Sequence, residues 1–305
     1  MKNLIIFLTI IIGLLPSHGN SKTLIVTPSD ALNVILKAAS SGDEIRLAKG
    51  IYKGSFIIDK PVHLNCLDGV VLDGNHQSNA LTVKAENVTI ENCNIINWGN
   101  DLTLMNAGIF VQKSAANITI KNNYLKGDTF GIWVDSSPRA LIVNNKVEGN
   151  LSIRSQDRGN GIHLFNVTNA LVQYNEVWHT RDGIYIDTSN NNQLINNELH
   201  DLRYGIHYMY SYNNLIKKNI TRRTRTGYAF MQSKFLTVED NRSENDSNYG
   251  MLMNFITNST VSGNQIVDTH QQQGLGGENF IKGGEGKALF IYNAHFNTVK
   301  NNLFS

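Results

Sequence analysis

Residues 183–209 read GIYIDTSNNNQLINNELHDLRYGIHYM and contain one full period of an internal repeat. The motif GIYI that begins at Gly183 returns as GIHY at Gly205. Further glycines continue this column, and they are Gly108, Gly131, Gly161, Gly227 and Gly250. The successive differences in residue number are 23, 30, 22, 22, 22 and 23, which reveals one insertion, the polar stretch 152–160. We align Lys287 with these glycines as the next copy, after a second, Gly-rich insertion.

A column of asparagines follows the same repeat, each three positions after an aliphatic residue. Its members are Asn123, Asn145, Asn175, Asn197, Asn219, Asn241, Asn264 and Asn302. Their successive spacings, which are 22, 30, 22, 22, 22, 23 and 38, place the two long intervals where the glycine column has its insertions. Because two independent columns share the same gaps, a structural repeat explains them better than chance does.

A regular period of about 22 residues, built from short alternating apolar segments, is typical of one coil of a β-solenoid. Asparagine suits the corners of such a coil because it tolerates the left-handed backbone conformation, and stacked asparagines can hydrogen-bond from coil to coil. Leucine-rich repeats have a similar period but need a leucine-rich consensus that this chain lacks. We therefore predict an all-β fold, a right-handed parallel β-helix with about 22 residues per coil and an N-terminal capping helix.

Residues 20–50 are predicted to form the N-terminal cap, and residues 51–305 the β-helix. Ser29 or Asp30 is placed to N-cap an amphipathic helix that runs through Ala39. Such a helix would hide the open edge of the first coil behind an apolar face formed by Ala31, Val34, Ile35 and Ala38. The chain stops without the atypical polar repeat that normally ends a solenoid, so we expect a C-terminal truncation.

Residues 1–19 have the pattern of a secretory signal peptide. Lys2 supplies the positive charge, residues 4–15 are apolar, and Ser17 and Gly19 are the small residues that a signal peptidase requires. The apolar run would span about 18 Å, short of a hydrocarbon core of about 30 Å, which favours a cleaved signal over a membrane anchor. We expect cleavage near Gly19 and export of the mature chain.

The composition excludes several classes of protein. Hydrophobic residues make up 41 % of the chain, which is enough for a core and excludes a largely disordered protein. The net charge of +2, without a basic stripe, argues against a nucleic-acid partner. Two cysteines can build neither a disulfide scaffold nor a four-cysteine zinc site. Cys66 and Cys93 fall in adjacent coils but one position out of register, which favours unpaired thiols over a disulfide because neighbouring strand positions face opposite sides.

In the strand after each glycine, the first and third positions are aliphatic and should face the core, so the second and fourth should face outward. The second-position column is Phe110, Trp133, His163, Tyr185, His207, Ala229, Leu252 and Leu289. The fourth-position column is Gln112, Asp135, Phe165, Asp187, Met209, Met231, Asn254 and Ile291. A solvent-exposed face would carry Lys, Glu, Thr and Ser, so these columns indicate a binding face or a covered one.

His207, Met209 and Met231 form the candidate metal site of this face. His207 and Met209 lie two positions apart on one strand, and Met231 lies one coil further, at the spacing of paired strands, about 5 Å. Two thioethers and an imidazole suit the soft ion Cu(I). The alternative is that the methionines fill gaps beneath a loop or at a partner surface. Met251 and Met253 fall on core positions and are interpreted as packing residues.

Three further signals remain open to two interpretations. His163 with Tyr185 and Asp187 could form a catalytic group or a stacked polar ladder. The Gly-rich stretch 274–287 resembles a phosphate loop only loosely, because Ala288 stands where a Mg²⁺-binding hydroxyl is needed, and we interpret it as a flexible surface insertion. Arginines that recur near the turns could meet an acidic partner or simply be solvated, and they are Arg154, Arg158, Arg181, Arg203, Arg222, Arg223 and Arg225.

Four motifs resemble the NosD family: RGNGIHL at 158–164, RDGI at 181–184, RYGIHYMYS at 203–211 and GYAFM at 227–231. The resemblance covers nearly the whole mature chain. NosD proteins are exported β-helix proteins required for the maturation of nitrous oxide reductase. Family members are usually longer, which agrees with the expected truncation.

The resemblance implies a periplasmic binding protein, not an enzyme, that works with an ABC transporter. It would take Cu(I) from a copper chaperone, bind it transiently, and serve assembly of the copper centres of nitrous oxide reductase. The implied partners are the membrane and ATPase subunits of the transporter, the copper chaperone and the apo reductase. An ATPase on a separate subunit agrees with the missing phosphate loop here.

The main alternative is a carbohydrate-active β-helix enzyme, such as a uronate lyase or epimerase, because one fold can host both kinds of protein. Such enzymes need clustered carboxylates, or carboxylates with a cation and a base, along one groove. The outward columns contain only Asp135 and Asp187, about 10 Å apart at two strand spacings, which is too wide for a tight acid pair. A purely structural or adhesive solenoid would not need histidine and methionine on one face.

Overall fold

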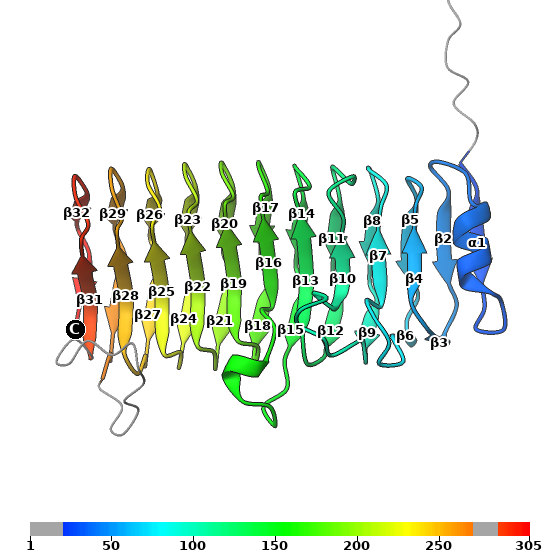
Figure 1. Cartoon of the computed structure of the whole chain (residues 1–305), viewed down its shortest axis with the longest axis horizontal. Coiled ribbons are helices and arrows are strands. Elements are labelled where there is room, and N and C mark those ends of the chain that lie inside the picture. Colours follow the sequence, from blue (N-terminus) through cyan, green and yellow to red (C-terminus); the bar gives the residue numbers. More distant parts are fainter. Residues whose placement is uncertain (1–20, 271–285) are drawn as a thin grey trace, which may run out of the picture.

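The computed structural model describes residues 21–270 and 286–305, and in them the chain winds into one long solenoid (Figure 1). Its coils stack along one axis and contribute short strands to three parallel sheets. The described chain makes about 11 right-handed turns of about 23 residues. The predicted right-handed parallel β-helix is confirmed. The expected signal peptide, residues 1–19, and most of the Gly-rich insertion lie outside the described residues.

Sheet A holds twelve of the described strands, which pair in parallel in the order in which the coils stack. They are β1 (Thr23–Val26), β2 (Glu44–Leu47), β5 (His63–Cys66), β8 (Thr89–Glu91), β11 (Thr119–Lys121), β14 (Leu141–Val143), β17 (Leu171–Gln173), β20 (Gln193–Ile195), β23 (Leu215–Lys217), β26 (Thr237–Glu239), β29 (Thr260–Ser262) and β32 (Thr298–Lys300).

Sheet B holds eleven described strands in the same parallel arrangement. They are β3 (Gly50–Lys53), β6 (Val70–Asp73), β9 (Asn94–Ile96), β12 (Tyr124–Lys126), β15 (Lys146–Glu148), β18 (Glu176–Trp178), β21 (Glu198–His200), β24 (Ile220–Arg222), β27 (Arg242–Glu244), β30 (Gln265–Val267) and β33 (Leu303–Phe304).

Sheet C holds ten described strands and contains the repeated glycine motif. They are β4 (Phe56–Ile58), β7 (Leu81–Val83), β10 (Ala107–Val111), β13 (Phe130–Asp135), β16 (Ile162–Phe165), β19 (Asp182–Asp187), β22 (Tyr204–Met209), β25 (Thr226–Met231), β28 (Tyr249–Asn254) and β31 (Lys287–Tyr292). Within a coil the chain runs from sheet C through sheet A to sheet B, as from β19 through β20 to β21.

The interior of the solenoid is filled by aliphatic side chains stacked coil upon coil. Ile162, Ile184 and Ile206 pair in register along sheet C and are fully buried. The glycine column has a steric cause at the same place, because a Cβ at Gly183 would lie 2.6 Å from the carbonyl oxygen of Gly205. The backbones of successive coils therefore approach as closely at this corner as only glycine permits.

The predicted N-terminal helix is confirmed as α1 (Leu32–Ala38), which lies against the first coils (Figure 1). Its apolar face is not the predicted one, because the helix buries Leu32 and Leu36 while Val34 is 66 % exposed. Leu32 and Leu36 are four positions apart, so they lie on one side of the helix, and both pack into the solenoid core. The other residues of that predicted face are exposed or half-buried, and they are Ala31, Ile35 and Ala38.

The predicted N-cap residues are also wrong. The carboxylate of Asp30 turns back and accepts hydrogen bonds from the backbone N–H and the hydroxyl of Thr27, at 2.7 and 2.8 Å. Ala31 therefore occupies the N-cap position, without a side-chain hydrogen bond to the helix. Packing of its leucines, rather than capping, stabilises this short helix.

The asparagine column forms the predicted hydrogen-bonded ladder, at the corner between sheets A and B. In Asn197, which is typical, the backbone N–H and Nδ2 both donate to Oδ1 of Asn219 in the next coil, at 3.0 and 2.9 Å. Nδ2 also donates to the carbonyl oxygen of Val172 in the preceding coil. The left-handed conformation falls on the preceding residue, such as Asn196 with φ 55°, so ladder and tight turn use different residues.

A second ladder, at the corner between sheets C and A, was missed by the sequence analysis. The backbone N–H groups of Ser189 and Ser211 donate to Oγ of the serine one coil further, Ser211 and Ser233, at 2.9 and 3.1 Å. The serine column is interrupted by Val167, which made its repeat harder to recognise than the asparagine repeat.

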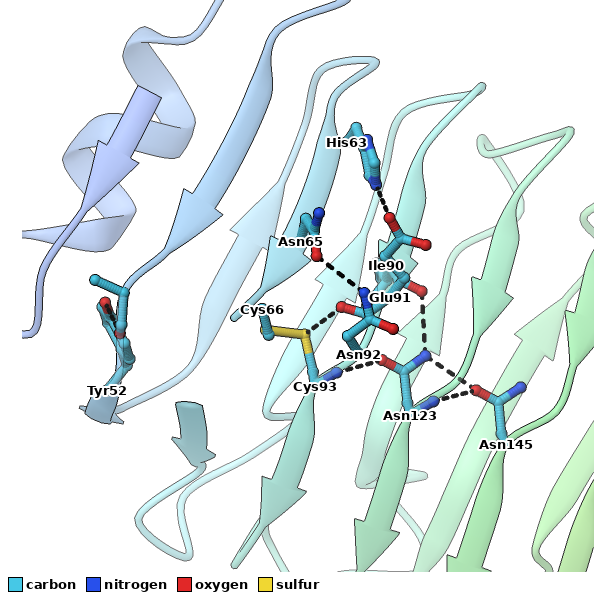
Figure 2. Close-up of a disulfide and its surroundings, with 11 residues drawn as sticks. Tyr52, His63, Asn65, Cys66, Ile90, Glu91, Asn92, Cys93, Asn123 and Asn145 are labelled. Carbon is cyan, nitrogen blue, oxygen red and sulfur yellow. Dashed lines mark hydrogen bonds and ion pairs between the residues drawn. A yellow bond between two sulfur atoms is a disulfide. The ribbon is translucent and has the colours of Figure 1, made fainter. Parts of the chain in front are cut away.

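The cysteine expectation was wrong, because Cys66 and Cys93 form a disulfide (Figure 2). The predicted register is correct, since Asn65 pairs with Glu91 and Cys66 is therefore level with Asn92. However, Asn92 adopts the left-handed conformation, with φ 63°, and the chain turns there. The alternation of faces ends at this turn, so Cys93 faces the same interior as Cys66.

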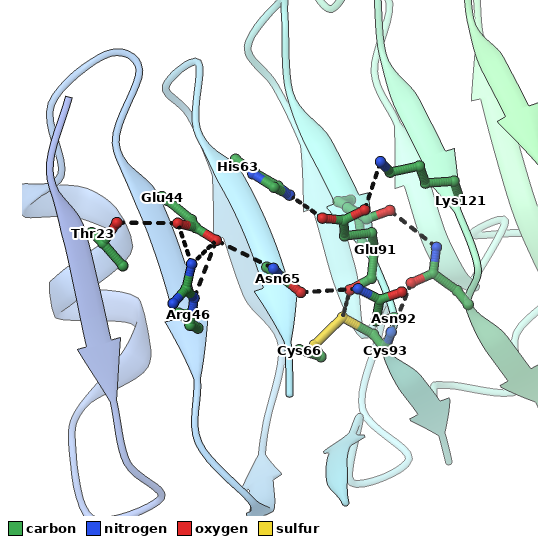
Figure 3. Close-up of polar contacts among 12 residues, drawn as sticks. Thr23, Glu44, Arg46, His63, Asn65, Cys66, Glu91, Asn92, Cys93 and Lys121 are labelled. Atoms are coloured by element: carbon green, nitrogen blue, oxygen red, sulfur yellow. Dashed lines mark hydrogen bonds and ion pairs between the residues drawn. A yellow bond between two sulfur atoms is a disulfide. The ribbon is translucent and has the colours of Figure 1, made fainter. Parts of the chain in front are cut away.

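Side-chain contacts also link the first coils along sheet A (Figure 3). Asn65 donates to Glu44 at 3.2 Å, while Glu91 accepts from His63 at 2.6 Å and pairs with Lys121 at 2.7 Å. Burial acts to raise the pKa of Glu91, but the bonds from Lys121 and His63 prevail and hold it below its usual value. These polar contacts and the disulfide join β2, β5, β8 and β11.

We expect Asn197→Ala or Asn219→Ala to lower the free energy of unfolding by about 1–3 kcal/mol, because each change leaves buried groups without a partner. Gln193→Ala, on the exposed face of β20, is the matched control and should change it by less than about 0.5 kcal/mol. Urea unfolding followed by circular dichroism measures the difference. Equal stability of all three variants would contradict a stabilising ladder.

We expect the double variant Cys66→Ala with Cys93→Ala to lose about 3 kcal/mol of stability, because the bridge restricts the unfolded chain between residues 27 positions apart. Urea unfolding with and without a reductant is the measurement. The reductant should destabilise the wild type to a similar extent and leave the variant unchanged. A wild type that is insensitive to full reduction would show that the bridge contributes nothing.

Candidate functional site

The outward column of sheet C has the predicted register over four coils. Trp133, His163, Tyr185 and His207 follow one another on β13, β16, β19 and β22. The ring centroids of successive residues are 3.9, 4.6 and 4.5 Å apart. Trp133 packs with Phe130 in a small cluster separate from the solenoid core, so this column lies on the outer side of the sheet.

The last rung corrects our alignment by one residue. β31 pairs with β28 so that Gly250 is level with Ala288 and not with Lys287. Ala288 has a side chain small enough for the position that glycine occupies in the other coils. Because this coil has no glycine there, the repeat was aligned one residue too early. The outward residues of β31 are therefore, in place of Leu289 and Ile291, the aromatic residues Phe290 and Tyr292.

The outward column is covered, yet a cavity remains beneath the cover. Trp133, His163 and His207 are only 7, 6 and 9 % exposed. Two segments between sheets B and C, residues 99–106 and 152–160, supply the covering residues. The cavity has a volume of about 300 Å³ and is lined by Leu102, Met105, Phe130, Trp133, Arg158, Asn160, His163, Arg181, Asp182, Tyr185, Arg203 and His207.

The second covering segment is tied to the solenoid by a buried arginine. It forms a 3₁₀-helix, Ser155–Asp157, which is followed by Arg158. The guanidinium of Arg158 donates to the carbonyl oxygens of Ile153, His179 and Leu151, at 2.7, 3.0 and 3.3 Å. Burial lowers the pKa of Arg158. The insertion that interrupts the repeat is therefore an ordered wall of the cavity.

Asp182 is the carboxylate of this cavity, and it is fully enclosed by its partners. Arg203 donates from Nε and Nη2 to its two oxygens at 2.8 and 2.6 Å, and Nδ1 of His207 lies 3.0 Å from Oδ2. Burial acts to raise the pKa of Asp182, but the bonds from His207 and Arg203 prevail and hold it well below its usual value. An ionised carboxylate only accepts, so Nδ1 of His207 carries a proton and Nε2 is the free nitrogen.

Asp182 was missed by the sequence analysis because it precedes the repeat glycine, outside the two outward columns. The signal that could have revealed it is the alignment of RDGI at 181–184 with RYGI at 203–206, which places Tyr204 level with Asp182 and Arg203 one residue before Tyr204 in the next coil. The carboxylates that were considered, Asp135 and Asp187, are two coils apart as predicted and do not line the cavity.

His163 is held as a neutral imidazole. Nδ2 of Asn160 lies 3.3 Å from Nδ1 of His163, and because an amide nitrogen only donates, the ring proton is on Nε2. Burial is the main cause that lowers the pKa of His163 to about 3. Burial also raises the pKa of Tyr185 to about 12. At neutral pH the imidazole of His163 is therefore uncharged, and the phenol of Tyr185 keeps its proton.

Met209 and Met231 lie directly opposite each other in the register of β22 and β25, and both are half-buried. His207, two positions before Met209 on β22, lines the cavity. Met251 and Met253 are fully buried in the solenoid core, as predicted. No three His, Cys, Asp or Glu residues gather into a metal-binding group in the described part of the chain.

Two family models match this chain. A model described as right handed beta helix region matches residues 51–156. A model described as periplasmic copper-binding protein (NosD) matches residues 143–305, more than half of the chain. The chain belongs to the NosD family. The resemblance found in the repeat motifs is thereby confirmed.

Two NosD proteins, each named "Probable ABC transporter binding protein NosD", are similar to this chain. The protein from Pseudomonas aeruginosa PAO1 is 54 % identical over 259 residues, which are 85 % of this chain and 60 % of that protein. The protein from Stutzerimonas stutzeri is 52 % identical over the same share of this chain and 59 % of its own length. The chain thus spans about 60 % of the length of the curated relatives it matches.

Several solved structures have the same architecture as this NosD family member. The family 28 exopolygalacturonase of Yersinia enterocolitica has a TM-score of 0.70 at 12 % identity and covers 91 % of this chain and 78 % of its own. The alginate lyase of Paenibacillus sp. FPU-7 has a TM-score of 0.62 at 18 % identity, and the match covers 91 % of this chain and 99 % of the lyase. Such low identities establish the shared β-helix fold alone. Among the described helices, none has the length and apolar character to cross a membrane.

We expect His163→Phe to make this NosD solenoid less sensitive to acid. The pKa of His163 is about 3 in the folded chain, against about 6.5 when unfolded, so the unfolded chain gains the proton first as the pH falls. The wild type should lose stability from about pH 6.5 downward, and the variant should lose less. Urea unfolding over a pH series measures this, with exposed His295→Phe as the control. The same pH dependence in all three proteins would contradict it.

Proposed function

We propose that this chain is a non-catalytic, periplasmic copper-handling protein that works with an ABC transporter to assemble the copper centres of nitrous oxide reductase. Membership of a family described as copper-binding supports copper as the cargo. The names of its relatives support an ABC transporter as the partner. One observation on the chain itself carries the proposal. Met209 and Met231 lie in register on the adjacent strands β22 and β25, on the outer face of sheet C, and His207 lies two positions before Met209.

Cu(I) is the ion that this methionine pair suits, because thioethers are soft ligands and select Cu(I) over Zn²⁺. His207 would contribute Nε2, since its Nδ1 is occupied by Asp182. β22 is hydrogen-bonded to β19 and β25, and β25 to β22 and β28, so the strand positions are fixed before the ion arrives. Met209 and Met231 are half-buried, so part of each side chain stays open to solvent, which allows the ion to be bound transiently and passed on.

The proposed partners follow from this cargo role. A copper chaperone would deliver Cu(I), the membrane and ATPase subunits of the transporter would hold the chain, and apo nitrous oxide reductase would receive the metal. A signal peptide cleaved near Gly19 would export the chain to the periplasm, where these proteins meet. The partial exposure of the methionine pair supports transfer by direct docking, because two proteins can reach it in turn.

A second candidate function, a uronate lyase or epimerase, is favoured by one observation. Asp182 binds Nδ1 of His207 and leaves Nε2 without a partner, and a histidine oriented by a carboxylate in this way can act as a general base. His207 lies next to the protonated Tyr185 in a cavity lined by arginines. Incubating the purified chain with alginate and polygalacturonate, followed by ultraviolet detection of unsaturated products and analysis of epimer content, tests this candidate. Turnover that is abolished in His207→Ala would favour the enzyme over the copper carrier.

We expect Met209→Leu with Met231→Leu to weaken Cu(I) binding by about tenfold or more while leaving the fold intact. Leucine retains the volume and apolar character of methionine, so the change removes only the sulfur atoms. Anaerobic competition titration measures the affinity, and circular dichroism checks the fold. The matched control is Met251→Leu with Met253→Leu, which removes two buried sulfurs and should leave the affinity unchanged.

Unchanged Cu(I) affinity in the folded Met209 and Met231 double variant would identify these sulfurs as packing atoms. An equal loss of affinity in the control would show that the response does not depend on the outer pair. Either outcome would overturn the proposed copper site.

A further inference from the structure

The cavity on sheet C contains N–H groups that lack acceptors. Nε1 of Trp133, Nε2 of His163 and Nε of Arg181 are buried without a hydrogen-bond partner, and all three residues line the cavity. The indole and guanidinium nitrogens can only donate, and the contact with Asn160 makes Nε2 of His163 a donor as well. Unpaired buried donors are costly, so a ligand that only accepts would relieve several of them together.

The cavity also has uncompensated positive charge. Asp182 is the one carboxylate among the lining residues, and it is neutralised by Arg203. Arg158 donates to three carbonyl oxygens, and neither Arg158 nor Arg181 forms an ion pair with any described carboxylate. Two guanidinium groups thus remain without a counter-charge, which favours an anionic ligand.

The remaining wall indicates an organic ligand with hydroxyl groups. Leu102, Met105, Phe130 and Trp133 offer apolar and aromatic surface that a bare inorganic ion would leave unused. Oδ1 of Asn160 is a buried acceptor without a donor, and a ligand hydroxyl could supply one. The volume of about 300 Å³ lies at the small end of ligand sites, which range over roughly 300–1,000 Å³.

We propose that this cavity binds a small hydroxylated carboxylate of the size of a sugar acid. Its carboxylate accepts hydrogen bonds from Arg181, His163 and Trp133, a hydroxyl donates to Asn160, and its body packs against the aromatic wall. This site goes beyond copper handling. Met209 and Met231 do not line it, so the two functions can be tested separately.

The test is calorimetric titration of the purified chain with galacturonate, beside galactose as the neutral counterpart and inorganic phosphate as the bare oxyanion. We expect saturable binding of galacturonate, about tenfold or more tighter than that of galactose or phosphate. Arg181→Gln should weaken galacturonate binding about tenfold or more, because it removes a charged donor. Arg225→Gln, an exposed arginine outside the cavity, is the matched control and should bind like the wild type.

A wild type that does not bind galacturonate, or an Arg181→Gln variant that binds it equally well, would overturn the proposal. Galactose or phosphate that binds as tightly as galacturonate would overturn it too. Should Arg181→Gln fail to fold, the indole N–H resonance of Trp133 in the wild type must shift with added galacturonate. Unaltered Cu(I) affinity in folded Arg181→Gln, together with lost galacturonate binding, would separate this site from the copper site.

Discussion

Hydrogen bonding between equivalent positions of successive coils is the constraint on which the other features of this solenoid depend. Within each of the three sheets the strands pair in parallel. Each buried asparagine, such as Asn197, forms hydrogen bonds to the coil before it and to the coil after it. A shift of one residue within a strand would turn every following side chain to the opposite face. Extra residues are therefore tolerated only at corners, and the described insertions, 99–106 and 152–160, both lie between sheets B and C.

The placement of these insertions gives sheet C two different outer surfaces. Where they cover it, histidine, tyrosine and tryptophan side chains enclose a cavity in which the buried Asp182 forms an ion pair with the half-buried Arg203. Outside the cavity, Met209 on β22 and Met231 on β25 are half-buried. His207 belongs to both surfaces, because Asp182 binds its Nδ1 and leaves Nε2 available. The two proposed binding sites thus share a single sheet and one histidine.

The fold by itself does not decide between a copper carrier and a carbohydrate enzyme, since solved enzymes share this architecture at very low identity. The difference lies in the side chains on the outer face of sheet C. A tight pair of carboxylates, which many glycosidases need, is absent among the residues that line the described cavity. Asp182 is held ionised by Arg203 and His207, so it orients the imidazole and does not itself donate a proton.

The sequence by itself determined the period, the solenoid, the asparagine ladder and the outward positions of His207, Met209 and Met231. These features follow from strand and corner positions that recur from coil to coil under the same packing and hydrogen-bonding constraint, so they leave columns in the sequence. Tertiary structure decided the Cys66–Cys93 bridge, the buried face of α1, and the cover that makes a cavity around Asp182. The helix and the covering insertions occur once and therefore leave no column. The left-handed turn at Asn92 recurs before each ladder asparagine, but residues as different as Tyr174 and Lys218 adopt it, so no residue type marks it in the sequence.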